Sequence, residues 1–118
     1  MSGSIELVLA RDSFAPNEVI RGSVSWEIAS TPRKVSVVVG WYTAGKGTTD
    51  EKIEHRDHWL TNALVGSQSF EFRLPPAPYS FSGTLIELLW YVEATTEAGK
   101  LRTRTHFDFS PEREPVQI

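Results

Sequence analysis

The chain has 118 residues, of which 40% are hydrophobic and 23% charged, with a formal net charge of -3 and no cysteine. This length fits one domain with a single core, and the lack of cysteine excludes disulfides, thiolate metal sites and cysteine nucleophiles. The acidic balance argues against general binding to nucleic acid, and no run approaches the roughly 18 apolar residues of a membrane span. The N-terminal sequence MSGSIELVLARD lacks a signal-peptide pattern, so we expect a soluble, cytoplasmic protein without membrane insertion.

The first third of the chain alternates with the period of β-strands. Ile5, Leu7 and Leu9 recur at every second residue, which predicts a short strand. Residues 14–18, FAPNE, predict a turn, because proline presets the first corner and asparagine tolerates the second. A second strand follows, in which Gly22 indicates a bulge or a close approach of backbones. The apolar row of this strand consists of Ile20, Gly22, Val24, Trp26 and Ile28.

A third strand after Pro32 carries apolar residues on both faces. One row consists of Val35, Val37, Val39 and Trp41, and the other contains Val38 and Tyr42. Residues 44–50 predict a polar connection rich in glycine, and residues 53–64 predict a further strand. A short amphipathic helix over 52–62 is the competing interpretation. Residues 45–49, GKGTT, resemble a phosphate loop only superficially, because the upstream glycine spacing and a following helix are missing; we expect a hairpin loop.

The stretch 70–94 combines a strand, a stiff bend and the most apolar strand of the chain. Pro75, Pro76 and Pro78 cannot continue a strand ladder, because proline lacks the N–H donor and has a fixed φ. The next strand has an inward row at every second position, formed by Ile86, Leu88, Trp90, Val92 and Ala94.

The last part of the chain predicts a hairpin partner for this apolar strand. Residues 97–100, EAGK, predict a tight turn, and 101–109 alternate as a strand whose polar face carries Arg102, Arg104 and His106. About seven strands and no long helix predict an all-β fold, an immunoglobulin-like antiparallel β-sandwich. We expect one domain over residues 1–110, followed by a loose C-terminal tail over 111–118.

Two separated motifs resemble the arrestin N-terminal-like domain family. Residues 14–24, FAPNEVIRGSV, are similar to the family's early aromatic, proline, glycine, glutamate and later-glycine pattern, with Asn17 in place of the usual glycine. Residues 74–94, which begin LPPAP and end in WYVEA, are similar to its leucine-proline loop and following strand. The resemblance spans roughly residues 5–110. It implies an arrestin-like sandwich that acts as a non-enzymatic adaptor or scaffold for proteins, although members of known function pair two such lobes.

The residues themselves supply no catalytic, cofactor-binding or metal site. His55 and His58 point to opposite faces if their segment is a strand, and His106 stands elsewhere, so we interpret them as surface histidines. No serine lies in a nucleophile elbow, which disfavours a hydrolase. We expect the arginine-rich face of residues 102–106 to be an ordinary solvated face.

The second apolar row predicts a protein-interaction surface formed by Val38, Tyr42, Leu89 and Tyr91. Outer faces of sandwiches are normally polar, so either a loop or tail covers this row or it mediates association with a protein partner or a second copy. The alternative function is a carbohydrate- or small-ligand-binding sandwich that uses Trp59, Tyr79 and Phe81 at one loop end.

Overall fold

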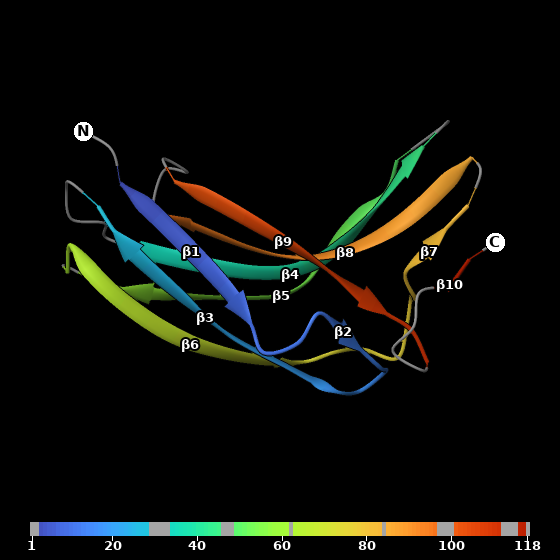
Figure 1. Ribbon diagram of the computed structural model, residues 1–118, viewed down its shortest axis with the longest axis horizontal. Helices are drawn as coiled ribbons and strands as arrows, with labels where there is room; N and C mark the ends of the chain where they lie inside the picture. Colours follow the sequence, from blue (N-terminus) through green and yellow to red (C-terminus); the bar gives the residue numbers. More distant parts are fainter. Residues whose placement is uncertain are drawn as a thin grey trace.

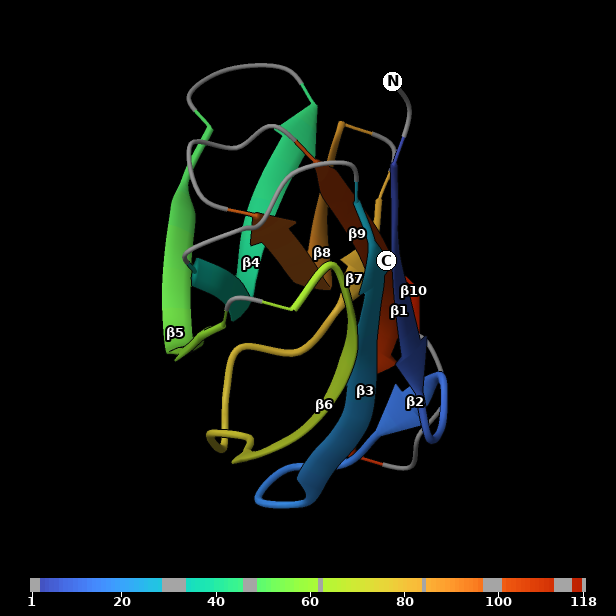
Figure 2. The same ribbon diagram turned by 90° about the vertical axis from the view of Figure 1, so that its left-hand side faces the viewer.

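The computed structural model consists of two facing layers of strands (Figures 1 and 2) and describes residues 3–28, 34–45, 49–61, 63–83, 85–96, 101–111 and 116–117. The strands are β1 (Ser4–Leu9), β2 (Ser13–Phe14), β3 (Val19–Glu27), β4 (Lys34–Gly45), β5 (Glu51–Leu60), β6 (Val65–Arg73), β7 (Phe81–Ser82), β8 (Ile86–Thr96), β9 (Arg102–Phe109) and β10 (Val116–Gln117). Seven of these have six residues or more, so the predicted sandwich of about seven strands is confirmed. Among the described residues, no helix is long and apolar enough to cross a membrane.

The strands form a small sheet and a large sheet. The small sheet has the order β1-β3-β6, and the large sheet has the order β10-β7-β8-β4-β5, with β9 also paired to β8. All long neighbours are antiparallel, whereas the short pairs β2–β9 and β7–β10 are parallel. Figure 2 shows the two layers edge on, with β4 and β5 on one side and β3 and β6 on the other.

The core lies between the inward rows that the alternation predicts. Val35, Val37 and Val39 of β4 and Trp90, Val92 and Ala94 of β8 are completely buried, and the small sheet contributes Ile20, Val24, Trp26 and Phe70. Ile86 was predicted to belong to the inward row of β8, but 37% of its surface is exposed. It pairs with Gly45 at the far end of β4, where both strands extend past the small sheet (Figure 1), so no facing layer covers it.

The proline-rich bend carries the chain from β6 in the small sheet to β7 in the large sheet. The Trp90 indole N–H donates a 2.7 Å hydrogen bond to the Pro78 carbonyl. The Ser80 N–H donates to the Phe109 carbonyl at 2.7 Å, and the Ser80 hydroxyl accepts the Phe109 N–H at 3.0 Å. These bonds attach the bend to β8 and β9 and satisfy polar groups that proline leaves without a ladder partner.

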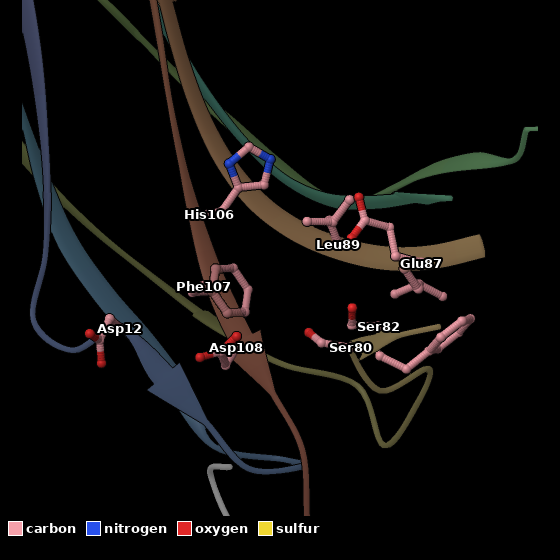
Figure 3. Close-up of a pocket in the computed structure, with 10 residues that line it drawn as sticks. Asp12, Ser80, Ser82, Glu87, Leu89, His106, Phe107 and Asp108 are labelled. Atoms are coloured by element: carbon pink, nitrogen blue, oxygen red, sulfur yellow. The ribbon is translucent and has the colours of Figure 1, made fainter. Parts of the chain in front are cut away.

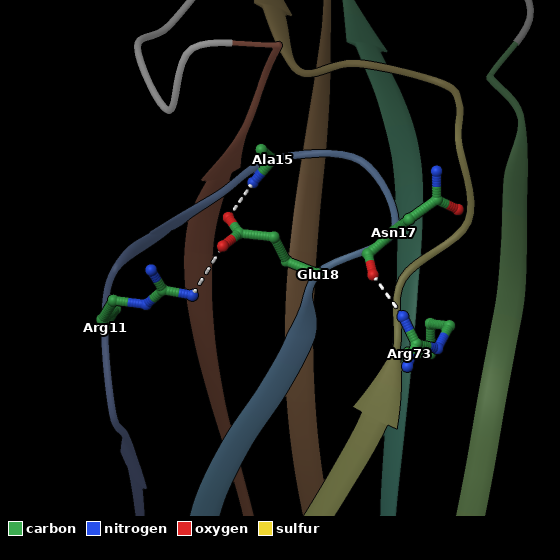
Figure 4. A network of polar contacts seen from close by, with 5 residues as sticks. All are labelled: Arg11, Ala15, Asn17, Glu18 and Arg73. Carbon is green, nitrogen blue, oxygen red and sulfur yellow. Dashed lines mark hydrogen bonds and ion pairs between the residues drawn. The ribbon is translucent and has the colours of Figure 1, made fainter.

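The FAPNE segment forms the predicted turn (Figure 4). The Glu18 N–H donates to the Ala15 carbonyl at 3.2 Å, and Asn17 has a φ of 64°, the left-handed value required at the third position of a type II turn. The Glu18 carboxylate accepts the Ala15 N–H at 2.7 Å and a guanidinium N–H of Arg11 at 3.3 Å. Arg73 donates to the Asn17 carbonyl at 2.8 Å, which ties the turn to the end of β6.

Two segments differ from the expectations, and a third lies outside the described residues. Residues 51–60 form the strand β5, so the helical interpretation of 52–62 is wrong; β5 pairs with β4 along its length, apart from a bulge at Glu54. The expected tail, 111–118, is not uniformly loose, because Val116–Gln117 pair with β7 as β10. The predicted turn 97–100 lies outside the described residues, but the β8–β9 hairpin that it would join is confirmed.

The left-handed position of Asn17 can be tested by substitution. A β-branched residue is strained at positive φ, so Asn17→Val should lower the free energy of unfolding by about 1–2 kcal/mol. Asn17→Gly should leave it within about 0.5 kcal/mol, because glycine accepts this conformation. Urea unfolding followed by tryptophan fluorescence measures both variants. Equal destabilisation by the two would contradict the turn geometry.

Candidate protein-interaction face

The four residues predicted as an interaction surface share the outer face of the large sheet. Tyr42 on β4 pairs with Leu89 on β8, and two residues further along each strand Gly40 pairs with Tyr91. Val38 follows on the same face, opposite Glu93. Side chains alternate along a strand, so this row is the reverse side of the buried Val35, Val37 and Val39 row. Val38, Tyr42 and Leu89 are half-buried.

Tyr91 is the exception on this face, because only 2% of its surface is exposed. A Cβ atom at its cross-strand neighbour Gly40 would lie 3.0 Å from the Tyr91 hydroxyl oxygen, so the phenol occupies the space that glycine leaves free. The Arg104 guanidinium lies 3.8 Å from the Tyr91 ring centroid and covers its other side. The second apolar row is therefore covered at Tyr91 by a β9 side chain.

Ion pairs and hydrogen bonds hold the covering side chains in place. The Glu93 carboxylate pairs with Arg104 at 3.2 Å and with Arg102 at 3.8 Å. The Tyr42 hydroxyl and Nε2 of His106 share a 2.9 Å hydrogen bond, and the Tyr42 and Tyr91 ring centroids are 5.9 Å apart. The predicted arginine-rich face of β9 is thus part of the same surface as the tyrosines. We define Val38, Tyr42, Leu89, Arg104 and His106 as the tyrosine–arginine face, with Tyr91 beneath it.

The buried position of Tyr91 changes its acidity. Burial removes water from the phenolate and raises the pKa of Tyr91 above its usual value of 10.0, and the carboxylate of Glu51 raises it further. The nearby Arg104 cation lowers the pKa of Tyr91, but it does not offset these effects. Tyr91 is therefore a neutral phenol at physiological pH.

The outer face of the small sheet has a different chemistry. Ser23 pairs with Ser69 and Ser25 with Ser67, so small hydroxyl side chains lie in adjacent cross-strand pairs on β3 and β6. The exposed ion pair of Arg21 and Glu71 continues this face at 2.9 Å. Val8 and Val65 are also exposed on this face, but they lie on its two edge strands, β1 and β6. The centre of the face is polar, as is usual for a sandwich, whereas the large sheet presents tyrosine, arginine and aliphatic groups.

The histidines do not form a metal site. His55 lies on the inward side of β5 but is only half-buried; its Nε2 donates an exposed 2.7 Å hydrogen bond to the Arg73 carbonyl, and its ring stacks on Phe72. His58 points to the opposite side of β5, as predicted for a strand, and His106 lies on the tyrosine–arginine face. Among the described residues, no group of three or more histidine, aspartate or glutamate side chains is arranged to hold a metal ion.

The structure does not bring the three aromatic residues of the alternative function together. Trp59 pairs with Val35 and packs against the core, at the end of the large sheet where β8 finishes at Thr96. Phe81 pairs with Leu88, which lies eight residues before Thr96 on β8. Eight residues of a strand span about 26 Å. The predicted common ligand site of Trp59, Tyr79 and Phe81 is therefore wrong, because the rings belong to opposite ends of the sheet.

Sequence reasoning missed Gly40 and Arg104 as parts of this face. The predicted turn at 97–100 could have identified Arg104. A four-residue turn places Thr96 opposite Leu101, and counting back along both strands then places Glu93 opposite Arg104, as the structure has them. The pairing of Gly40 with Tyr91 had no comparable signal, because the long connections between β4 and β8 leave their register open.

Comparisons with known proteins support the fold. No family model matches the chain, and no curated protein matches its sequence. Among solved structures, it is similar to the sporulation control protein Spo0M from Bacillus subtilis, with 15% identity and a TM-score of 0.66 over 93% of this chain and 50% of that chain. It is also similar to part of a beta-glucosidase from Listeria innocua, with 14% identity and a TM-score of 0.51 over 97% of this chain and 16% of that chain. The chain thus spans half the length of Spo0M, and at these identities the likeness establishes the fold alone, an arrestin-like β-sandwich.

The close packing of Tyr91 on Gly40 predicts a strong effect of a small substitution. In Gly40→Ala, the new Cβ would lie 2.6 Å from the Lys52 carbonyl oxygen and 3.0 Å from the Tyr91 hydroxyl. We expect the free energy of unfolding to fall by about 1–3 kcal/mol. Ser36→Ala on the same strand adds no atom and should stay within about 0.5 kcal/mol. Urea denaturation compares the two, and an unaffected Gly40→Ala would refute the packing.

The raised pKa of Tyr91 predicts a pH dependence of stability. Its contribution is fully present below the unfolded pKa of about 10 and is lost as pH rises through the higher folded value. The free energy of unfolding of the wild type should therefore fall above pH 10, and that of Tyr91→Phe should fall less over the same range. Urea unfolding at pH 8 and at several values above 10 measures this, with the more exposed Tyr79→Phe as control. Parallel decline in wild type and Tyr91→Phe would show that the phenol does not contribute.

Proposed function

We propose that the chain is a non-enzymatic, arrestin-like interaction module that binds a protein through the tyrosine–arginine face. The observation that carries this proposal is the contrast between the two outer faces. The small sheet presents serine pairs at its centre and single exposed valines, Val8 and Val65, on its edge strands, whereas the large sheet presents half-buried Val38, Tyr42 and Leu89 together beside Arg104. Tyrosine and arginine are enriched in the central parts of protein interfaces, and serine is depleted there.

The ordered side chains of this face favour binding with a low entropic cost. Arg104 is held by Glu93 and by the Tyr91 ring, and Tyr42 is held by His106. A partner that packs on these groups does not need to immobilise them, so less of the contact energy is lost to ordering. A second copy of the chain is one partner that this proposal allows, since self-association would also protect the free sheet edges.

A matched pair of valine substitutions tests the proposed face. Val38→Lys places a charge on the tyrosine–arginine face, and Val8→Lys places the same charge on the small sheet, where Val8 is 59% exposed. Affinity purification from the source cell with mass spectrometry identifies the partners, and light scattering reports the mass of the purified chain. We expect Val38→Lys to recover at least tenfold less of the partner than Val8→Lys does. If the partner is a second copy of the chain, we expect the molar mass of Val38→Lys to fall to that of the monomer.

Both variants should fold, because exchanges at strand surfaces usually change stability by less than about 0.5 kcal/mol. Circular dichroism checks this. If folded Val38→Lys keeps the same partners and the same mass as wild type, the tyrosine–arginine face is not the interaction surface. Loss of the partner in Val8→Lys alone would assign binding to the small sheet.

A further inference from the structure

A hollow adjoins the tyrosine–arginine face, where two strands, β7 and β9, pair with the same edge of β8. β9 pairs with β8 from Thr95 to Trp90, and β7 takes the same edge at Leu88 and Glu87. Leu89 lies between the two partners. Beyond Phe107, β9 turns away to pair with β2, which opens a cavity of about 290 Å³ between β7, β8 and β9 (Figure 3).

The walls of this cavity combine apolar surface with carboxylates. Phe81, Leu88, Leu89 and Phe107 supply its apolar part. Figure 3 shows the Glu87 carboxylate on one side of the hollow, with Asp12 and Asp108 on the other. A ligand with an apolar stem and a cationic end would match both features, because methylene groups pack on such walls while the charge stays at the polar rim.

The three carboxylates are not neutralised within the described part of the chain. Asp12, Glu87 and Asp108 form no ion pair with any described residue, whereas the nearby Arg11 pairs with Glu18 and Arg104 with Glu93. His106, which also lines the cavity, shares its Nε2 hydrogen bond with Tyr42. The described residues therefore give the cavity a net negative charge, which attracts a cation.

One buried hydroxyl adds a directional group to the cavity wall. Ser80 lines the cavity and is only 7% exposed. Its oxygen accepts the Phe109 N–H at 3.0 Å, which fixes its position. A serine hydroxyl has a second lone pair, so Ser80 can also accept a hydrogen bond from an N–H group inside the cavity.

From this charge complementarity we infer that the cavity receives an arginine side chain of the protein partner. This inference rests on the proposed function, because it names the chemistry of a partner at the border of the tyrosine–arginine face. A guanidinium has five donors in one plane and stacks on aromatic rings, so it suits separate carboxylates beside Phe81 and Phe107 better than a compact ammonium does. A metal ion is disfavoured, since no group of three or more described histidine, aspartate or glutamate side chains is arranged to hold one.

Nuclear magnetic resonance titration tests the arginine site on the intact chain. The probe is Nα-acetyl-L-arginine amide, and its control is the citrulline analogue, which has the same shape but no charge. We expect the arginine probe alone to shift the amide signals of residues 81–82, 87–89 and 106–108. Glu87→Gln should raise the Kd about threefold, and Glu87→Gln with Asp108→Asn about tenfold.

Glu27→Gln is the matched control, because Glu27 is an exposed glutamate of the small sheet without an ion pair to any described residue. Equal shifts with the citrulline probe, no shifts at the cavity, or an unchanged Kd in the double variant would overturn the site. If Val38→Lys still loses its partner in that case, only the arginine site fails. If the probe binds but Val38→Lys loses nothing, the proposed face fails and the cavity stands.

Discussion

The buried Trp90 is the residue on which the sandwich depends most. Its indole is fully buried between the sheets, and the ring centroids of Trp90 and Phe109 are 5.0 Å apart. The N–H of the same ring donates to Pro78, in the segment that carries the chain from the small sheet to the large one. A tryptophan can fill a core and satisfy a polar group at its edge, so one side chain joins β8, β9 and the crossing segment.

The position of Trp90 also fixes what the other side of β8 presents. Because side chains alternate, burial of Leu88, Trp90 and Val92 directs Leu89 and Tyr91 to the outer face. Gly40 on β4 gives the Tyr91 ring its space, and Arg104 on β9 covers it, so three strands contribute to one ordered surface. The same β8 edge, shared by β9 and β7, opens the acidic cavity next to that surface. The tyrosine–arginine face and the cavity are thus two consequences of how one strand is placed.

Much of this arrangement could be predicted from the sequence, because it follows from local rules. Period two identified the inward rows of β3, β4 and β8, and the turn chemistry of Pro16 and Asn17 predicted the reversal between β1 and β3. Their order along the chain also gave the two-layer architecture. The shared face of Val38, Tyr42, Leu89 and Tyr91 was predicted for the same reason, since residues of one parity in paired strands must lie together.

The parts that could not be predicted depend on register between distant strands. Neither the pairing of Gly40 with Tyr91 nor the cavity between β7, β8 and β9 can be recognised from a local sequence pattern. Each depends on how strands separated by long connections are placed against one another. The exposure of Ile86 depends on where the small sheet ends, and the alternation of residues within β8 does not indicate that position. The two-residue strands β2, β7 and β10 are too short to show any period.

Hydroxyl-radical footprinting of the chain purified together with its cellular partner tests the central claim most directly. Oxidation is read at side chains by mass spectrometry, so the two outer faces are compared within one sample. The account predicts that the partner lowers oxidation of Tyr42, Leu89 and His106 and leaves the exposed Val8 and Val65 of the small sheet unchanged. Protection of Val8 and Val65 with unchanged oxidation of Tyr42 and Leu89 would contradict it.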